Sequence, residues 1–196
     1  MAYIERAWRR GDEIHYRSVC KSRMSTNTHY ISDELHYQEV MERMVGVKRE
    51  LWIGTADIKD VYVKKGRKAV PLLGVQASLL ERGVNVRLIH AKEPGPAFRE
   101  DFDKYPILAT NLERAMCPRV HFKLIIMDLE TAYIGSANLT GAALGMKSEQ
   151  RRNFEAGILT TDSELVSRAI RHFDYVWMGQ PCAACGRKQY CADRIV

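Results

Sequence analysis

The chain has 196 residues, 46% of them hydrophobic, which is enough to bury a substantial core in a single domain. No apolar run approaches the roughly 18 residues that cross a bilayer, and the first ten residues lack the apolar segment of a signal peptide. We therefore expect a cytoplasmic protein without membrane association. The net charge of +6 favours an anionic partner such as nucleic acid, although basic faces that are only solvated would give the same balance.

Apolar periodicities along the chain predict strands that alternate with helices. Strands are expected at residues 14–19, 51–55, 84–89, 122–127, 132–134 and 153–160, and helices at 33–45, 70–82 and 162–177. Ser32 is a candidate N-cap for the first helix, and Gly83 is a C-cap for the second. The strand, helix and strand between residues 51 and 89 resemble a βαβ crossover with parallel strands. This order of elements is typical of an α/β sandwich.

The second half of the chain contains a predicted hairpin with polar residues at one end. Two apolar runs, Phe122–Met127 and Ala132–Ile134, flank the polar turn 128–131 and indicate two mostly buried strands. His121 and Lys123 stand two residues apart at the start of the first strand. Their side chains should therefore leave the same face of the sheet.

Polar side chains after the second strand complete a longer pattern. Ser136 and Asn138 lie beside the start of the first strand if the two strands pair antiparallel, so one end gathers an imidazole, an ammonium, a hydroxyl and an amide. The spacing fixes six positions over eighteen residues, His121-x-Lys123-x4-Asp128-x6-Gly135-Ser136-x-Asn138. It resembles the HKD motif of the phospholipase D superfamily. The resemblance implies a phospholipase D-like α/β fold, with a mixed β-sheet flanked by helices on both faces.

The motif residues have the chemistry that phosphodiester cleavage requires. The oxygens of a phosphodiester repel nucleophiles and its alkoxide leaves poorly, so cleavage needs a nucleophile, positive charge, amide donors and an acid. His121 is expected to be the nucleophile, since a neutral imidazole nitrogen attacks phosphorus, and Lys123 is expected to supply fixed positive charge. Asn138 and Ser136 are expected to donate hydrogen bonds to the substrate. No catalytic metal is expected.

One set of these residues lacks the general acid. The resemblance implies that two motifs combine, with one histidine as nucleophile and the other as acid. Because the chain carries a single His-x-Lys pattern, we expect a twofold homodimer in which both His121 residues face one pocket. Glu155 resembles the acidic residue that superfamily members place against the histidine, where it would hold the ring tautomer and stabilise the imidazolium. The alternative for Glu155 is a surface carboxylate paired with Arg151 or Arg152.

Asp128 belongs to the motif by position but lies at the far end of the strand from His121. A strand of seven residues spans roughly 20 Å, so we interpret Asp128 as a structural turn residue of the motif. The remaining histidines have no motif partners and are expected to be surface or packed residues: His15, His29, His36, His90 and His172.

Three cysteines lie within ten residues near the end of the sequence: Cys182, Cys185 and Cys191. In a chain expected to be cytoplasmic, such a cluster indicates a metal site before a disulfide. Structural zinc takes four ligands, so Cys20 or Cys117 should supply the fourth. Cys20 is preferred, because Cys117 precedes the catalytic strand by only four residues. The pattern also resembles the iron–sulfur staple of certain nucleases, and free reduced cysteines are the third alternative.

The sequence thus predicts a phospholipase D-like domain at residues 1–180, with 1–30 as an N-terminal extension, and a cysteine-rich metal-binding tail at 181–196. The preferred function is a metal-independent endonuclease that acts on DNA or RNA through a phosphohistidine intermediate in a homodimeric site. A short chain with one motif resembles the nuclease branch of the superfamily more than its two-motif lipases. The alternatives are a phospholipase D or phosphatidyl transferase, and a non-catalytic module that binds nucleic acid.

Overall fold

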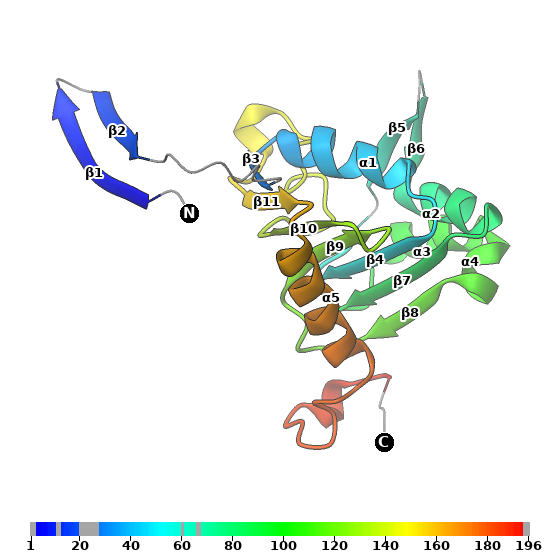
Figure 1. The fold of residues 1–196 in the computed structure, drawn as a ribbon. Coiled ribbons are helices and arrows are strands. Elements are labelled where there is room, and N and C mark those ends of the chain that lie inside the picture. Colours follow the sequence, from blue (N-terminus) through cyan, green and yellow to red (C-terminus); the bar gives the residue numbers. More distant parts are fainter. Residues whose placement is uncertain (1–2, 11–12, 20–27, 60, 66–67, 194–196) are drawn as a thin grey trace.

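The structure is built around one seven-stranded mixed sheet (Figure 1). The computed structural model describes residues 3–10, 13–19, 28–59, 61–65 and 68–193, with the backbone alone at 3–10, 13–19, 64–65 and 68–69. The strands are β1 (Tyr3–Arg10), β2 (Glu13–Val19), β3 (Thr28–Ser32), β4 (Glu50–Thr55), β5 (Tyr62–Lys65), β6 (Lys68–Pro71), β7 (Asn85–His90), β8 (Glu113–Met116), β9 (Lys123–Met127), β10 (Thr131–Gly135) and β11 (Ala156–Thr160). The large sheet has the order β3-β11-β10-β9-β4-β7-β8, while β1–β2 and β5–β6 form separate two-stranded pairs.

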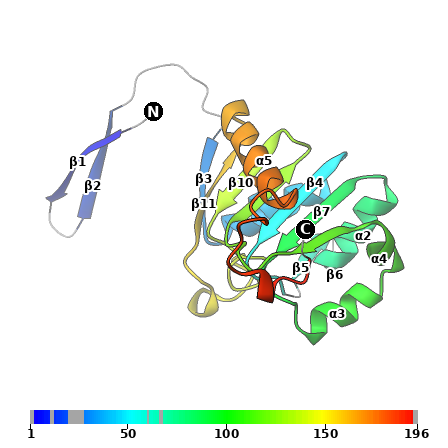
Figure 2. The same ribbon diagram turned by 90° about the horizontal axis from the view of Figure 1, so that it is seen from below.

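Helices cover both faces of this sheet, as the sequence predicted. They are η1 (His36–Met41), α1 (Glu42–Val45), α2 (Leu72–Glu81), α3 (Pro96–Asp103), α4 (Pro106–Asn111), η2 (Glu149–Arg151), α5 (Ser163–Trp177) and η3 (Lys188–Tyr190). On one face α5 packs across β9 and β10, whereas η1, α1, α2 and α4 lie on the other (Figures 1 and 2). Asp162 caps α5 by accepting a hydrogen bond from the Leu165 N–H at 2.9 Å. The fold is therefore a mixed α/β sheet between two helical layers.

The crossover from β4 through α2 to β7 has the predicted topology. The two strands pair in parallel, with Glu50 opposite Asn85 at one end and Thr55 opposite His90 at the other. Gly83, just after α2, has a φ of +82°, a left-handed backbone conformation that glycine adopts without strain. Because the strands are parallel, their carboxyl ends emerge at the same edge of the sheet.

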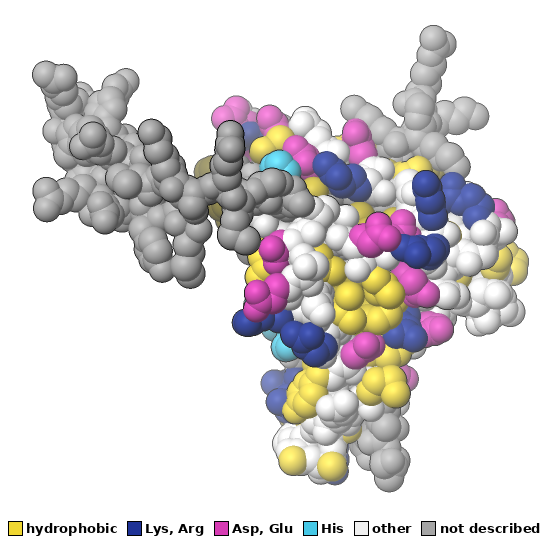
Figure 3. Space-filling model, viewed as in Figure 1, with side chains coloured by type: hydrophobic (Ala, Val, Ile, Leu, Met, Phe, Trp, Pro, Cys, Tyr) yellow, Lys and Arg dark blue, Asp and Glu magenta, His cyan; other side chains and the backbone are white. Residues whose placement is uncertain are grey.

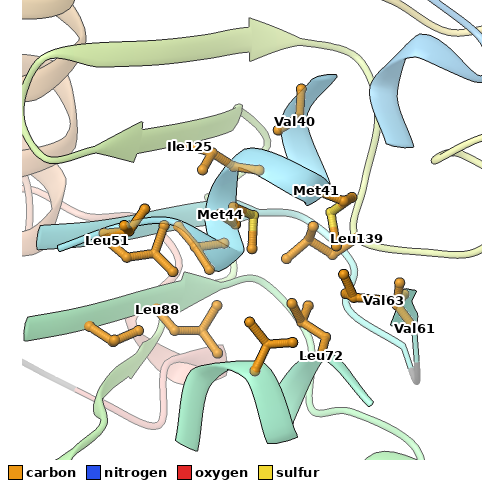
Figure 4. Close-up of a cluster of buried hydrophobic side chains, with 14 of the residues drawn as sticks. Val40, Met41, Met44, Leu51, Val61, Val63, Leu72, Leu88, Ile125 and Leu139 are labelled. Atoms are coloured by element: carbon orange, nitrogen blue, oxygen red, sulfur yellow. The ribbon is translucent and has the colours of Figure 1, made fainter. Parts of the chain in front are cut away.

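Alternation along β4 divides the core into two clusters. Leu51 and Ile53 face η1, α1 and α2, where they join a large cluster of buried aliphatic side chains (Figure 4). Trp52 faces the opposite side and packs against Phe173 of α5, with 5.3 Å between the ring centroids. A strand buried on both faces has no polar alternation, which explains the uninterrupted apolar run that predicted it. Each fully buried side chain of this size contributes about 1.5–3 kcal/mol.

The hairpin of β9 and β10 is antiparallel, as predicted, and places Lys123 opposite Gly135. Asp128 and Leu129 form its turn with φ values of +54° and +59°. Positive φ at both central residues is typical of the hairpin turns whose twist matches that of the flanking strands. The turn lies at the opposite end of the hairpin from Lys123.

Asp128 joins this turn to the start of β4. Its carboxylate accepts hydrogen bonds from the backbone N–H groups of Arg49 at 2.7 Å, Lys48 at 3.1 Å and Glu50 at 3.2 Å. Burial alone would raise the pKa of Asp128, but these donors outweigh burial and lower the pKa from its usual value. The geometry is that of a residue that stabilises a turn.

Replacing Asp128 with Asn is expected to lower the free energy of unfolding at pH 7 by about 1–3 kcal/mol, because three N–H groups lose a charged acceptor. Asn tolerates positive φ as Asp does, so the backbone is not strained further. The pKa of Asp128 is lower in the folded state than its unfolded-state value of about 3.9. Asp128 therefore stabilises the fold fully at pH values above 3.9, and this stabilisation is lost as the pH falls through the folded-state pKa. Urea unfolding of both proteins at pH 7 and at low pH measures this. An effect that does not shrink on acidification would contradict the argument.

The first helix begins later than predicted, and Ser32 is not its N-cap. Ser32 ends β3 and pairs with Ala156 of β11, so the sheet uses its backbone. Asp33 follows with a φ of +48°, and the helical turn starts only at His36. No strand was predicted at β3, because Ile31 is the one buried residue among its five.

The N-terminal extension predicted at residues 1–30 contains the β1–β2 hairpin and most of β3. Cys20 lies outside the described residues. Within the described ranges, no helix combines the length and the apolar character that crossing a membrane requires.

Candidate active site

One end of the β9–β10 hairpin gathers the first polar residues of the motif. His121 is exposed just before β9, and Lys123 is the first residue of that strand. The Lys123 ammonium donates to the His121 carbonyl oxygen at 2.8 Å, and its Nζ lies 3.4 Å from each ring nitrogen of His121. Their separation by two residues thus places an imidazole and a cation side by side.

Lys123 is a largely desolvated cation, since the residue is only 8% exposed. Burial lowers the pKa of Lys123 from its usual value, while the carboxylate of Glu155 acts in the opposite direction. Electrostatic attraction is stronger where water is excluded. An anion that reaches this edge of the sheet would therefore interact with Lys123 more strongly than with a solvated surface lysine.

Asn138 is oriented by the loop that follows β4. Its Oδ1 accepts a hydrogen bond from the Asp57 N–H at 3.1 Å and lies 3.3 Å from the donating Thr55 hydroxyl. The Lys59 N–H donates to the Leu139 carbonyl at 3.0 Å and joins the same two loops. Because the carbonyl oxygen of the Asn138 amide is occupied, its amino group is the part of the side chain available to an anion.

Glu155 and Ser136 form a second polar pair at this edge. The Ser136 hydroxyl donates to one Glu155 oxygen, and the Asn153 amide donates to the other at 3.1 Å. Arg152, one of the alternative partners predicted for Glu155, pairs instead with Glu34 at 2.6 Å. The carboxylate of Glu155 is therefore oriented by two side-chain donors, close enough to Lys123 to affect its pKa.

A buried tyrosine supports the loop that carries Ser136 and Asn138. The Tyr133 hydroxyl accepts a hydrogen bond from the Ala137 N–H at 3.1 Å. Burial raises the pKa of Tyr133 to about 12, so the hydroxyl is neutral at physiological pH. A Cβ atom at Gly135 would collide with this hydroxyl, which explains why the motif position needs glycine.

Removing this hydroxyl with Tyr133→Phe is expected to lower the free energy of unfolding by about 1–3 kcal/mol, because the buried Ala137 N–H loses its acceptor. Tyr190→Phe, at a ring that is 62% exposed, is the matched control and should change stability by less than about 0.5 kcal/mol. Urea unfolding measures both values. If the two substitutions had the same effect, the hydroxyl would not support the loop.

The metal site predicted from Cys182, Cys185, Cys191 and Cys20 is not supported by the structure. Among the described residues, no group of three or more His, Cys, Asp and Glu side chains is placed to hold a metal ion. Cys20 belongs to the undescribed part, and Cys117, the other candidate for the fourth ligand, lines the same 660 Å³ cavity as the three tail cysteines. Four thiols thus line one cavity, but their side chains are not arranged as the ligands of one metal ion.

Two of the tail thiols have hydrogen-bond partners of their own. The Cys191 thiol donates to the Met116 carbonyl at 3.8 Å, and the Cys185 sulfur accepts from the Arg187 N–H at 3.4 Å. The Arg187 N–H, followed by the Arg119 guanidinium, lowers the pKa of Cys185, whereas burial raises the pKa of Cys191. Metal ligation needs thiolates that converge on one ion, and no such set is assembled among the residues that the structure describes.

These features define a phospholipase D-like domain: a hairpin with one His-x-Lys pair, in a mixed seven-stranded sheet between helical layers. The family model described as cardiolipin synthase, PLD-like domain, matches residues 47–177. Because the match spans more than half of the chain, the chain belongs to this phospholipase D-like family. The domain is thereby that of a phosphodiester hydrolase or transferase.

Solved structures share this fold at low sequence identity. NucT from Helicobacter pylori has a TM-score of 0.56 and 15% identity, over 77% of this chain and 95% of NucT. Nuc from Salmonella typhimurium, a phospholipase D family member, has a TM-score of 0.55 and 16% identity over the same shares. The archaeal chromatin protein TrmBL2 has a TM-score of 0.55 and 16% identity, over 78% of this chain and 52% of TrmBL2. No curated protein sequence matches the chain.

Sequence reasoning did not identify the residues that support the motif from other elements. Thr55 and Asp57, which orient Asn138, precede it in the sequence by about eighty residues. His36 is also buried beside Tyr133, with 5.5 Å between the two ring centroids and the rings edge-on to each other. Burial lowers the pKa of His36. The available signal for Thr55 was its place at the carboxyl end of a predicted parallel strand, where α/β sheets carry their sites.

Proposed function

We propose that this chain is a metal-independent endonuclease that cleaves nucleic acid through a phosphohistidine intermediate, in an active site shared by two copies. One observation carries the proposal. An exposed imidazole, a desolvated ammonium and an oriented amide gather at one end of the β9–β10 hairpin. His121 would act as nucleophile, Lys123 as the fixed cation and Asn138 as a donor to the phosphoryl oxygens.

In the first step, a neutral ring nitrogen of His121 attacks phosphorus, and a P–N bond forms while the bond to the leaving oxygen breaks. The leaving alkoxide takes a proton from the partner's His121, which acts as general acid. Lys123 and Asn138 stabilise the charge on the phosphoryl oxygens. In the second step, a water molecule gives a proton to the partner's His121 and attacks phosphorus. The P–N bond then breaks, and His121 is released as a neutral imidazole.

Glu155 is assigned the role of the carboxylate that assists the catalytic histidine. A carboxylate beside a histidine fixes the ring tautomer and stabilises the imidazolium that forms during proton transfer. Support comes from the position of Glu155 at the catalytic edge, where its oxygens are oriented by Ser136 and Asn153. Ser136 therefore acts on the phosphate indirectly, through the orientation of Glu155.

The choice of nucleic acid as substrate rests on charge and on one structural relative. The net charge of +6 favours a polyanion, and TrmBL2 is described as a chromatin protein that binds DNA. On the face shown in Figure 3, Lys and Arg side chains are interspersed with Asp and Glu. We therefore expect few phosphate contacts from this face, and only a small contribution from it to the salt dependence of binding.

The deciding experiment is cleavage of plasmid DNA, single-stranded DNA and single-stranded RNA in excess EDTA, with His121→Ala beside the wild type. Cleavage that resists EDTA and is abolished by the substitution would support the histidine mechanism and identify the polymer. A folded, dimeric wild-type protein that cuts none of these substrates would overturn the proposal.

A phosphatidyl transferase is the second candidate, because the description of the matching family names cardiolipin synthase. The same nucleophile, cation and amide would act on a phospholipid phosphodiester. Turnover of phosphatidylglycerol in vesicles, without cleavage of nucleic acid, would select this function. Nucleic-acid binding that survives His121→Ala, with no turnover of either substrate, would select a non-catalytic binding module.

A further inference from the structure

A buried histidine lies beneath the catalytic edge and has no part in the proposed chemistry. His36 is the first residue of η1, and its side chain is completely buried. Its ring packs edge-on against Tyr133 on the η1 face of the sheet. Lys123 lies on this same face, since it alternates along β9 with Leu124, which belongs to the α5 side. His36 is therefore on the side of the sheet where the motif residues gather.

The side chain of His36 closes the turn between β3 and η1. Its Nδ1 lies 3.0 Å from the Asp33 carbonyl oxygen, which can only accept, so Nδ1 carries the proton and donates. The backbone N–H of His36 donates to the same oxygen at 3.2 Å. Asp33 has a φ of +48°, a left-handed conformation that residues other than glycine rarely adopt without support. Two donors from one residue thus hold a turn that the backbone alone would not favour.

This turn holds the backbone of Glu155. The Asp33 N–H donates to the Glu155 carbonyl oxygen at 3.3 Å, directly before β11 begins. The carboxylate of Glu155 is close enough to raise the pKa of His36, although burial has the larger effect and lowers it. Ser136 and Asn153 orient the carboxylate itself. Glu155 is thus fixed twice, with its side chain held by these two donors and its backbone held by the Asp33 turn.

We propose that His36 is a positioning residue that fixes Glu155 through the Asp33 turn. The proposal rests on the proposed function, in which Glu155 assists the catalytic histidine. The titratable groups that face His36 are Asp33, Glu155 and Tyr133, and its Nε2 has no hydrogen-bond partner among the described residues. A proton on Nε2 would therefore be buried without an acceptor, so the ring stays neutral. His36 supplies one fixed donor and a ring against Tyr133, and an aliphatic residue would supply neither.

The test compares His36→Phe and His36→Asn with wild type by the pH profile of kcat for nucleic-acid cleavage in EDTA. Phe keeps a ring beside Tyr133 but removes the donor, so kcat should fall roughly 10- to 100-fold. The bell-shaped profile should also move to lower pH, because a displaced Glu155 no longer stabilises the imidazolium of His121. The amide nitrogen of Asn is bonded to Cγ, as Nδ1 is in histidine, so His36→Asn should restore both the rate and the profile.

His90→Phe is the matched control for general destabilisation. His90 is equally buried and its Nδ1 donates to the Lys92 carbonyl at 2.7 Å, but it belongs to β7, four strands from β11 in the sheet order. His90→Phe should lower the melting temperature about as much as His36→Phe and leave the pH profile unchanged. The second control is Glu155→Gln, alone and combined with His36→Phe. If His36 acts through Glu155, the combined variant should lose little activity beyond that of Glu155→Gln.

The outcomes separate the role of His36 from the nuclease. If His36→Phe lowers kcat only as much as His90→Phe does, with an unchanged pH profile, His36 is a structural residue and the proposal is wrong. Additive losses from His36→Phe and Glu155→Gln would overturn it as well. If the wild type cleaves nothing, the nuclease is wrong, and the pKa of His121 measured by NMR titration decides the positioning role. Both substitutions should then lower the pKa of His121, and an effect of Glu155→Gln alone, or of neither, would overturn the role of His36.

Discussion

Replacing His121 with Ala is expected to reduce the rate of phosphodiester cleavage at least about 1,000-fold while leaving the free energy of unfolding nearly unchanged. The side chain is exposed, so its removal takes away a reactive nitrogen and no core contact. In the proposed dimer the substitution removes the nucleophile and the general acid together, since each copy supplies one histidine. Binding of nucleic acid should persist, because Lys123 and Asn138 remain to contact phosphate. The effect should therefore fall on kcat far more than on KM.

Trapping of the intermediate makes this prediction more specific. Wild type quenched during turnover of a phosphorus-labelled substrate should carry the label on His121 as an acid-labile phosphoramidate, and His121→Ala should carry none. His172→Ala is the matched control, because His172 is also exposed but lies on α5 with its ring against Phe122 at 5.2 Å. The control should cleave at the wild-type rate. Labelling of a residue other than His121 would contradict the assigned nucleophile.

The hairpin was predictable because all its information is local. The two apolar runs, the polar turn and the spacing of His121 and Lys123 lie within a few residues of one another, and the period-2 geometry of a strand converts that spacing into a shared face. β4, α2 and β7 were predicted for the same reason, because a buried strand, an apolar helix and a glycine C-cap each have a short sequence pattern. For these elements the local pattern was sufficient.

The supports of the site were not predictable, because they depend on pairing between distant elements. Asp57 can orient Asn138 only when β9 is paired with β4, and no spacing in the sequence predicts that contact. Tyr133 has the pattern of a core residue, and its hydroxyl role becomes visible only when Ala137 folds over it. Ser32 was misassigned for a related reason: its capping pattern is local, but pairing with β11 determines its conformation.

The metal prediction is not supported in the described part of the chain, and the gap lies at the step from composition to geometry. Cys-x2-Cys is a local pattern, but a metal site also requires a convergent set of thiolates, which depends on how the tail packs beside β8 and α5. The structure brings Cys117, Cys182, Cys185 and Cys191 to one cavity, but among the described residues no group of three or more ligand side chains is placed to hold an ion. Proximity of ligand types is necessary for a metal site but does not establish one.

Asn138→Asp is expected to lower kcat by about 100- to 1,000-fold, the usual loss when a donor to a developing negative charge is removed. The substitution is isosteric, so the oxygen that accepts from Asp57 is retained and the loop should keep its position. The amino group, however, is replaced by a negatively charged oxygen that repels the phosphoryl oxygens. Asn111→Asp, at an exposed residue of α4, makes the same chemical change away from the site and should cleave normally.

The measurement for Asn138→Asp is single-turnover cleavage in EDTA, with urea unfolding of the same preparation. Reduced cleavage with unchanged stability would separate a role toward the substrate from a structural role. If the free energy of unfolding fell together with the cleavage rate, the main role of Asn138 would be to join the loops after β4 and β10. Unchanged cleavage would show that the amide does not contact the reacting phosphate. The amino group of Asn138 matters because the fold occupies its carbonyl oxygen and leaves a fixed donor at the edge where Lys123 carries the positive charge.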